Sequence, residues 1–305
     1  MSHPKTPTPI VKLNDPLFEE KNVEVYVKRD DLTDSEIMGN KWRKLKYNLE
    51  KARKENYDVI ASYGGAYSNH IAALAAAGRI YKIRTVGIIR GEELTPDSNA
   101  TLQKARKDGM SLHFVSRQDF RVLKHELQLP FQDAGKIMIL PEGGTNLLAI
   151  KGCAELVSEI PLEKFDLLAL PVGSGGTFAG IASALPGHIE LWGFYALKGS
   201  WMEDHTREIL QKYQISFSNF RIFTDTKFGG FGRVNADLLQ FILNFRQNFR
   251  ILLDPVYTAK MFFSVGEMIK NDQIASGKRI LLLHTGGLQG IEGIKQRYQL
   301  ALPTL

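Results

Sequence analysis

The stretch DLLALPVGSGGTFAGIASAL, residues 166–185, contains an apolar strand, a glycine-rich turn and the start of a helix. An apolar run of this length, bounded by glycines and followed by small apolar residues, is typical of a strand–turn–helix unit. A single unit of this kind cannot cover both faces of its strand, so it needs similar neighbours in a sheet. The stretch therefore predicts an α/β fold.

Seven further segments have the length and apolar composition of strands. They are residues 23–27, 58–63, 83–89, 111–115, 136–140, 189–197 and 279–285. Segments with helical spacing lie between or beside them, at 42–55, 70–79, 97–108, 117–128, 146–159, 176–185, 201–213, 235–249 and 258–270. This alternation predicts two open, mostly parallel twisted sheets flanked by helices.

The order of these segments also suggests how the chain divides. A length of 305 residues favours two domains. We expect residues 43–149 to form a smaller α/β domain, and residues 1–42 plus 150–305 to form a larger domain that holds the ligand. Residues 1–22, which are rich in proline and charge, are expected to form an irregular arm.

The composition, 44% hydrophobic and 24% charged, is ordinary for a globular protein. The single cysteine, Cys153, excludes an intrachain disulfide and fits a reducing compartment. No apolar run approaches the roughly 20 residues of a membrane span, and we expect a cytoplasmic protein without membrane partners. The formal charge is +6, but acidic residues interrupt most basic clusters, which favours a solvated surface over nucleic-acid binding.

Glycine pairs follow several of the predicted strands. These pairs are Gly64-Gly65, Gly143-Gly144, Gly175-Gly176 and Gly286-Gly287. Glycine allows positive φ and lets a ligand approach the backbone closely. Because ligands of open α/β sheets bind beyond the carboxyl ends of the strands, we expect these turns to line one cleft.

The turn that contains Ser174, Gly175, Gly176 and Thr177 is the sharpest of the set. Consecutive amides before a helix, together with two hydroxyls, form a nest that suits a phosphate. The dinucleotide fingerprint fails because Phe178 occupies the position of its last glycine. The Walker A pattern fails as well, because Ile181-Ala182 stands where Lys-Ser/Thr is required.

Other candidate residues lie at the starts of helices. Ser68 and Asn69 open a helix, and either one can be its N-cap, which leaves the other free to face the cleft. Tyr257 is read either as a core residue or as a ring with its hydroxyl in the cleft. Lys41 stands between a Gly-Asn turn and a helical run. Taken alone it reads as a surface lysine, and the glycine turns that it could face single it out.

Six stretches, in this order, resemble the pyridoxal-phosphate (PLP) enzymes of fold type II, the tryptophan-synthase-β-like group. They are VKRDDL (27–32), GNKWRKL (39–45), GGAYSNH (64–70), PVGSGGT (171–177), LDPVYTAK (253–260) and LLLHTGG (281–287). Within the group, the chain is similar to the branch of D-cysteine desulfhydrase and 1-aminocyclopropane-1-carboxylate (ACC) deaminase. The stretches span almost the whole chain and are more specific for fold and cofactor than for substrate.

The resemblance implies a role for each candidate residue. Lys41 would be the Schiff-base lysine, and Asn69 would contact the hydroxyl on the cofactor ring. The turn from Ser174 to Thr177 would hold the phosphate.

Thr285 would lie against the pyridine nitrogen, with Thr258 nearby. A neutral hydroxyl at that position favours elimination over transamination. Ser68 would contact the substrate and relay a proton, and Tyr257 would be an active-site tyrosine. The substrate carboxylate would be held by Ser68, Asn69 and His70.

Two positions depart from the branch. ACC deaminase has a glutamate where this chain has Thr258, and the branch has a second active-site tyrosine where this chain has Phe231. Both departures count against ACC as the substrate, and the second puts strict D-cysteine specificity in doubt.

The resemblance therefore implies α,β-elimination from a small amino acid, with D-cysteine giving a 2-oxo acid, ammonia and sulfide. A homodimer is implied as well. The alternatives are ACC deaminase, a dehydratase or racemase of the same fold, a weakly active relative, and a phosphate-ligand binder without a Schiff base. His70 and His284 lack a third ligand at suitable spacing, so no metal is expected.

Overall fold

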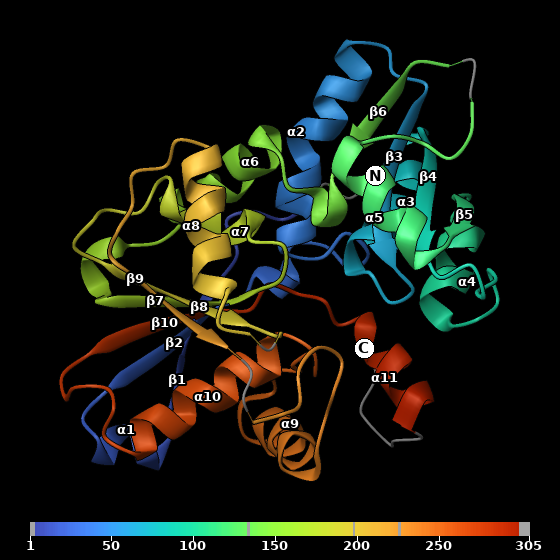
Figure 1. Cartoon of the computed structure of the whole chain (residues 1–305). Helices are drawn as coiled ribbons and strands as arrows, with labels where there is room; N and C mark the ends of the chain where they lie inside the picture. Colours follow the sequence, from blue (N-terminus) through green and yellow to red (C-terminus); the bar gives the residue numbers. More distant parts are fainter. Residues whose placement is uncertain (1–3, 133–134, 198, 225–226, 299–305) are drawn as a thin grey trace.

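The computed structural model describes residues 4–132, 135–197, 199–224 and 227–298. Its strands form two separate sheets, each covered by helices on both faces (Figure 1). The predicted α/β fold of two open, mostly parallel sheets is confirmed.

The larger sheet has six strands. In spatial order they are β1 (Ile10–Leu13), β2 (Glu24–Lys28), β10 (Arg279–Leu283), β7 (Leu167–Val172), β8 (Glu190–Tyr195) and β9 (Phe220–Thr224). Only β1 is antiparallel to its neighbour. The last strand among the described residues, β10, therefore lies between the amino-terminal pair and the strands β7 to β9.

The smaller sheet has four parallel strands. Their order is β5 (Ser111–Val115), β4 (Arg84–Arg90), β3 (Val59–Gly65) and β6 (Ile137–Leu140). The strand membership of the two sheets agrees with the expected division at residues 42–43 and 149–150, and the division into domains stays a prediction.

The helices are α1 (Pro16–Glu20), α2 (Asn40–Lys54), α3 (Asn69–Tyr81), α4 (Ala100–Lys107), α5 (Arg117–Glu126), α6 (Leu147–Ser158), α7 (Gly176–Ala182), α8 (Met202–Lys212), α9 (Ala236–Phe249), α10 (Thr258–Lys270) and α11 (Gly290–Tyr298). Short 3₁₀ turns occupy Asp30–Leu32, Glu142–Gly144 and Leu162–Lys164.

The larger sheet is buried on both faces, which explains its continuous apolar strands. Every residue of β7 is buried, and alternate residues enter different cores. Leu167 and Ala169 pack with α9 and α10, whereas Leu168 and Leu170 pack with α6, α7 and α8. A period of two along the strand produces this division.

Helix α2 lies where the two sheets meet, above the larger sheet in Figure 1. Leu45, Leu49 and Ala52, predicted to share a face, are buried in the core of the smaller sheet with residues of α3. On another side of α2, the carbonyl of Arg43 lies against Gly152 of α6, where a Cβ atom would collide with it. Helix α2 therefore packs closely against elements of both sheets.

Three parts of the secondary structure differ from the sequence reading. Residues 1–22 are not an irregular arm throughout, because β1 and α1 lie within them. Strand β9 and helix α11 were not predicted. Both β1 and β9 lie at edges of the larger sheet and are less buried than β7, so they lack a long apolar run.

Candidate active site

Lys41 lies in the first turn of α2, and a tight backbone contact fixes that turn. The preceding Gly39 has a φ of +60°, and a Cβ atom there would collide with the carbonyl of Thr285. The same carbonyl accepts a hydrogen bond of 3.2 Å from the amide of Asn40. Only glycine combines this φ with this approach at low cost. The loop after β10 therefore holds the start of the helix that carries Lys41.

The amine of Lys41 is joined to the glycine-rich turn after β7 by one side chain. Lys41 Nζ donates to Asn40 Oδ1 at 2.8 Å, and Asn40 Nδ2 donates to Thr177 Oγ1 at 2.9 Å. Burial, assisted by the positive charge of Lys44, lowers the pKa of Lys41 from 10.5 to about 7. About half of this amine is therefore neutral, and so nucleophilic, at neutral pH.

The predicted phosphate-binding turn contains hydroxyls and receives a buried cation. Ser174 Oγ lies 3.0 Å from Thr145 Oγ1, and Lys44 Nζ donates to Ser174 Oγ at 3.2 Å and to the carbonyl of Gly143 at 2.8 Å. A Cβ atom on Gly176 would lie 2.5 Å from Thr145 Oγ1 and 3.0 Å from Lys44 Nζ, so the turn needs glycine. Hydroxyls and an ammonium group form a donor set that suits an anion.

Lys44 is a residue that the sequence reading missed. It lies three positions after Lys41 on the same helix, and burial lowers its pKa to about 8. A spacing of three places two helical side chains on one face, so the sequence GNKWRKL did contain a signal. That signal was hidden by the abundance of lysine.

The segment after β3 meets the segment after β10. Ser68 is the N-cap of α3, since its Oγ accepts a hydrogen bond from the amide of Ile71 at 3.3 Å. Asn69 is the following residue, and Cβ atoms at Gly287 and Gly290 would lie 2.9 and 3.3 Å from its amide group. Of the two candidate caps, Ser68 is the N-cap. The side chain of Asn69 faces the loop that follows β10.

His70 points into the smaller sheet and is neutral. Its Nε2 lies 3.1 Å from Ser62 Oγ. The other hydrogen-bond partners of that hydroxyl, among the described residues, are the carbonyl oxygens of Leu140 and Pro141. The hydroxyl therefore donates to a carbonyl and accepts from Nε2–H. Burial, with Lys44 and Lys41 nearby, holds the pKa of His70 well below its ordinary value. A role for His70 with substrate stays a prediction, and this ring brings no positive charge.

The segment before α10 is organised by the buried carboxylate of Asp254. It accepts hydrogen bonds from the amides of Tyr257 and Thr258, each at 2.8 Å, and from the hydroxyl of Thr258 at 2.5 Å. The hydroxyl of Thr258 is thus already engaged, which weakens its predicted contact with the cofactor.

Tyr257 lies between Gly173 and Phe231. A Cβ atom on Gly173 would lie 3.3 Å from the tyrosine ring, and the Phe231 ring packs edge-on against it at 5.8 Å. Burial, together with the charge of Asp254, raises the pKa of Tyr257. Its hydroxyl therefore stays protonated at neutral pH, next to the strand that leads to the glycine-rich turn.

Thr285 and His284 follow β10. Thr285 is buried, and its carbonyl fixes the start of α2 as described above. His284 has a structural role, because its Nε2 lies 2.7 Å from the carbonyl of Leu252 and its Nδ1 accepts from the amide of Gly286. Within the described residues, no group of three or more His, Cys, Asp or Glu side chains is placed to hold a metal ion.

A sequence profile described as "Pyridoxal-phosphate dependent enzyme" matches residues 1–286. The chain belongs to this family of PLP-dependent enzymes. The resemblance seen in the sequence is thereby confirmed at the level of fold, cofactor and enzyme class.

Two relatives and one solved structure match nearly the whole chain. A bifunctional D-cysteine desulfhydrase/ACC deaminase of Arabidopsis thaliana is 28% identical and covers 93% of this chain and 77% of its own length. A D-cysteine desulfhydrase of Klebsiella pneumoniae is 27% identical and covers 92% of both chains. The crystal structure of an ACC deaminase homologue superposes with a TM-score of 0.81 at 26% identity, covering 98% of this chain and 95% of its own.

The residues described above fit PLP. A lysine with a lowered pKa can hold an aldehyde covalently, and the turn with Ser174, Thr177 and Lys44 offers donors to a phosphate. Gly176 leaves the cradle open where any larger residue would fill it.

Proposed function

We propose that the protein is a PLP-dependent amino-acid lyase that catalyses α,β-elimination, with D-cysteine as its substrate. Water and D-cysteine would give pyruvate, ammonia and hydrogen sulfide. The observation that carries the proposal is the position of the Lys41 amine, which Asn40 joins to the glycine-rich turn through two hydrogen bonds. The lowered pKa of Lys41 supports it. The names of the relatives, D-cysteine desulfhydrase and ACC deaminase, support the reaction class.

In this proposal the chain holds the cofactor at three places. Lys41 binds it covalently, and Ser174, Gly175, Gly176, Thr177 and Lys44 bind its phosphate. Asn69 and Thr285 contact its ring, as the resemblance implies. When bound, PLP draws electrons from the substrate's Cα and makes the proton there acidic.

Side chains of the protein then accept the proton of the reaction and donate hydrogen bonds to the substrate. Lys41 Nζ, displaced as a neutral amine, takes the proton from Cα. Tyr257, whose raised pKa keeps its hydroxyl protonated, donates a hydrogen bond to the departing sulfur, which leaves as the thiolate. Ser68 offers its hydroxyl hydrogen to the substrate carboxylate, since its oxygen lone pair is used by the amide of Ile71.

ACC deamination is the second candidate, favoured by the names of the relatives. Two features make it the weaker one. The hydroxyl of Thr258, which stands where ACC deaminase has a glutamate, is bonded to Asp254. Phe231 next to Tyr257 lacks a hydroxyl. A dehydratase or racemase activity on another small amino acid is the further alternative.

The test begins with the near-visible absorption of the purified protein, before and after addition of D-cysteine. Borohydride reduction followed by peptide mass spectrometry should find the cofactor on Lys41, and sulfide and pyruvate should form in equal amounts. Lys41→Ala should abolish turnover, whereas Lys46→Ala, on the same helix, should retain it. Sulfide production by Lys41→Ala at the wild-type rate would refute the proposal, and ammonia from ACC alone would favour the second candidate.

A homodimer, which the resemblance implies, and a cytoplasmic location, expected from the composition and the single cysteine, remain part of the proposal. Sedimentation of the purified protein tests the first. For the second, none of the described helices is long and apolar enough to cross a membrane, and a fluorescent fusion in the source cell would test the location itself.

A further inference from the structure

The helix that carries Lys41 begins without a side-chain cap. Several other helices have a serine or asparagine N-cap whose side chain accepts a hydrogen bond from a backbone amide of the first turn. These helices are α3, α4, α5, α6 and α9. Helix α2, like α7, α8 and α10, has no such side-chain hydrogen bond, and its N-cap is Gly39. A glycine at this position costs a helix only a few tenths of a kcal/mol. The Thr285 carbonyl holds the turn from the side of Gly39, and a second interaction acts on the same turn from the side of Arg43.

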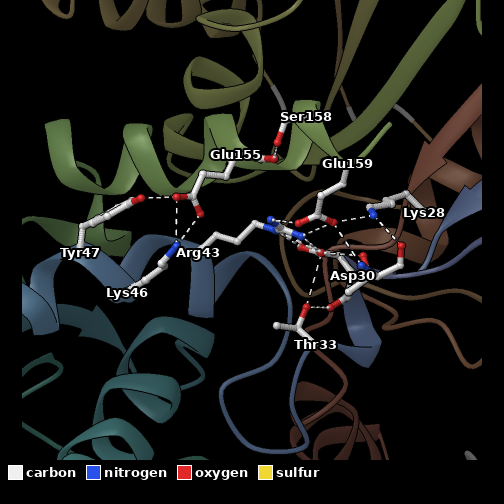
Figure 2. A network of polar contacts seen from close by, with 10 residues as sticks. Lys28, Asp30, Thr33, Arg43, Lys46, Tyr47, Glu155, Ser158 and Glu159 are labelled. Carbon is white, nitrogen blue, oxygen red and sulfur yellow. Dashed lines mark hydrogen bonds and ion pairs between the residues drawn. The ribbon is translucent and has the colours of Figure 1, made fainter. Parts of the chain in front are cut away.

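That interaction is a buried cluster of four charges, shown in Figure 2, that surrounds Arg43 (two residues after Lys41). Arg43 donates to both oxygens of Asp30, at 2.6 to 3.1 Å, and to both oxygens of Glu159, at 2.8 and 3.1 Å. Lys28 completes the cluster, since its Nζ donates to Glu159 at 2.6 Å and to the carbonyl of Thr8 at 2.6 Å.

The cluster links three segments of the chain, one of which is distant in the sequence. Asp30 follows β2, Arg43 is in α2, and Glu159 follows α6. The side chains of Lys28, Asp30 and Arg43 are at most 2% exposed, and that of Glu159 is 11% exposed. The paired charges raise the pKa of Arg43 and lower that of Glu159, so both stay ionised.

Burying four charges is a costly way to stabilise a protein, because their desolvation offsets most of the attraction. What such a cluster does provide is geometry. The planar guanidinium of Arg43 is fixed by two carboxylates at once, which defines both its position and its orientation. The carbonyl of Arg43 also lies against Gly152, so the same residue fixes the backbone of α2 on α6.

We propose that Arg43, held by Asp30 and Glu159, is a positioning residue that sets the rotation of the first turn of α2 and thereby places the Lys41 amine at the cofactor site. The proposal rests on the proposed covalent role of Lys41. Because the cluster contains two positive and two negative groups, it orders the turn without adding net charge beside Lys41.

The test compares Arg43→Lys with Glu155→Gln. Lysine keeps the charge of Arg43 but cannot bond two carboxylates in a plane. Glu155 is the matched control, because it accepts from Lys46 across the same two helices, outside the cluster and about one-third exposed (Figure 2). The main measurement is the circular dichroism of the bound cofactor's near-visible band, divided by its absorbance, which reports a fixed orientation. Melting temperatures and kcat and KM for D-cysteine are measured in parallel.

For Arg43→Lys we expect the dichroism per absorbance to fall at least about threefold, and kcat to fall roughly 100-fold with KM nearly unchanged, as for a reactive group misplaced by about 1 Å. Glu155→Gln should keep both values within about twofold. If Arg43→Lys does not fold, Glu159→Gln, which keeps shape and removes one partner of Arg43, is measured in the same way and is expected to show the same loss in weaker form.

Wild-type dichroism and kcat in folded Arg43→Lys or Glu159→Gln would overturn the positioning role, and so would an equal loss in Glu155→Gln. A different result would contradict the proposed function, namely that the cofactor of the wild-type protein is attached to another lysine.

Discussion

The lowered pKa of Lys41 predicts an unusual reactivity of the cofactor-free protein toward acylating reagents. With a pKa of about 7, half of the Lys41 amine is neutral at pH 7. At the same pH only about 0.03% of an ordinary lysine is neutral. The neutral, reactive fraction of Lys41 is therefore roughly a thousandfold larger. The perturbation is a pH series from 5.5 to 9.5 on protein freed of cofactor.

The sign of the pH dependence follows from the direction of the shift. Below pH 7 the protonated form of Lys41 dominates, and the acylation rate should rise tenfold per pH unit. Above pH 7 the amine is already neutral, so the rate should level off. Ordinary lysines continue to gain reactivity up to their pKa near 10.5.

The assay is a brief reaction with limiting acetic anhydride, followed by quantitative mass spectrometry of the peptide that contains Lys41. The exposed Lys107 on α4 is the internal reference. Limited access of the reagent to Lys41 lowers its acylation rate by the same factor at every pH. The pH at the midpoint of the rate profile therefore still reports the pKa of Lys41. A rate ratio of Lys41 to Lys107 that stays constant from pH 5.5 to 9.5 would refute the reasoning.

Three further predictions concern the same region. Lys44→Met removes a neighbouring cation, so the acylation midpoint of Lys41 should move to higher pH, and inorganic phosphate should compete less well with PLP in equilibrium binding. Gly39→Ala combines a φ of +60° with a collision at the Thr285 carbonyl, and should cost about 2 kcal/mol or more in urea unfolding. Ser68→Ala removes the N-cap of α3, which should cost about 1 kcal/mol by the same measurement, while Ser68→Asn should restore it.

The parts of the fold that the sequence predicts are those in which local pattern and burial agree. Strand β10 is apolar and buried from Ile280 to Leu283, in the middle of its sheet. Strand β1 has one buried residue, Leu13, and lies at the edge, so its local sequence has no strand pattern. Helix α11 is short and its first turn contains two glycines, which hid it.

The candidate site divides in a similar way. The glycine turn at Ser174 could be predicted from the sequence, because its glycines and hydroxyls are contiguous between an apolar strand and a helix. The cluster around Arg43 could not be predicted in this way, because Arg43 is 13 residues from Asp30 and 116 residues from Glu159. Charged residues read as surface until the fold brings their partners together, so only the structure could identify this cluster.

The position of β10 sets the order in which a newly synthesised chain can complete this site. Residues 279–283 lie between β2 and β7, so the amino-terminal strands β1 and β2 cannot join the strands that lead to the glycine-rich turn at Ser174 until residue 283 has left the ribosome. The smaller sheet, complete by residue 140, has no such delay. We expect ribosome-bound chains stalled before residue 279 to protect β3 to β6 from proteolysis and yet to bind no PLP, because domains that wait for a distant strand fold last.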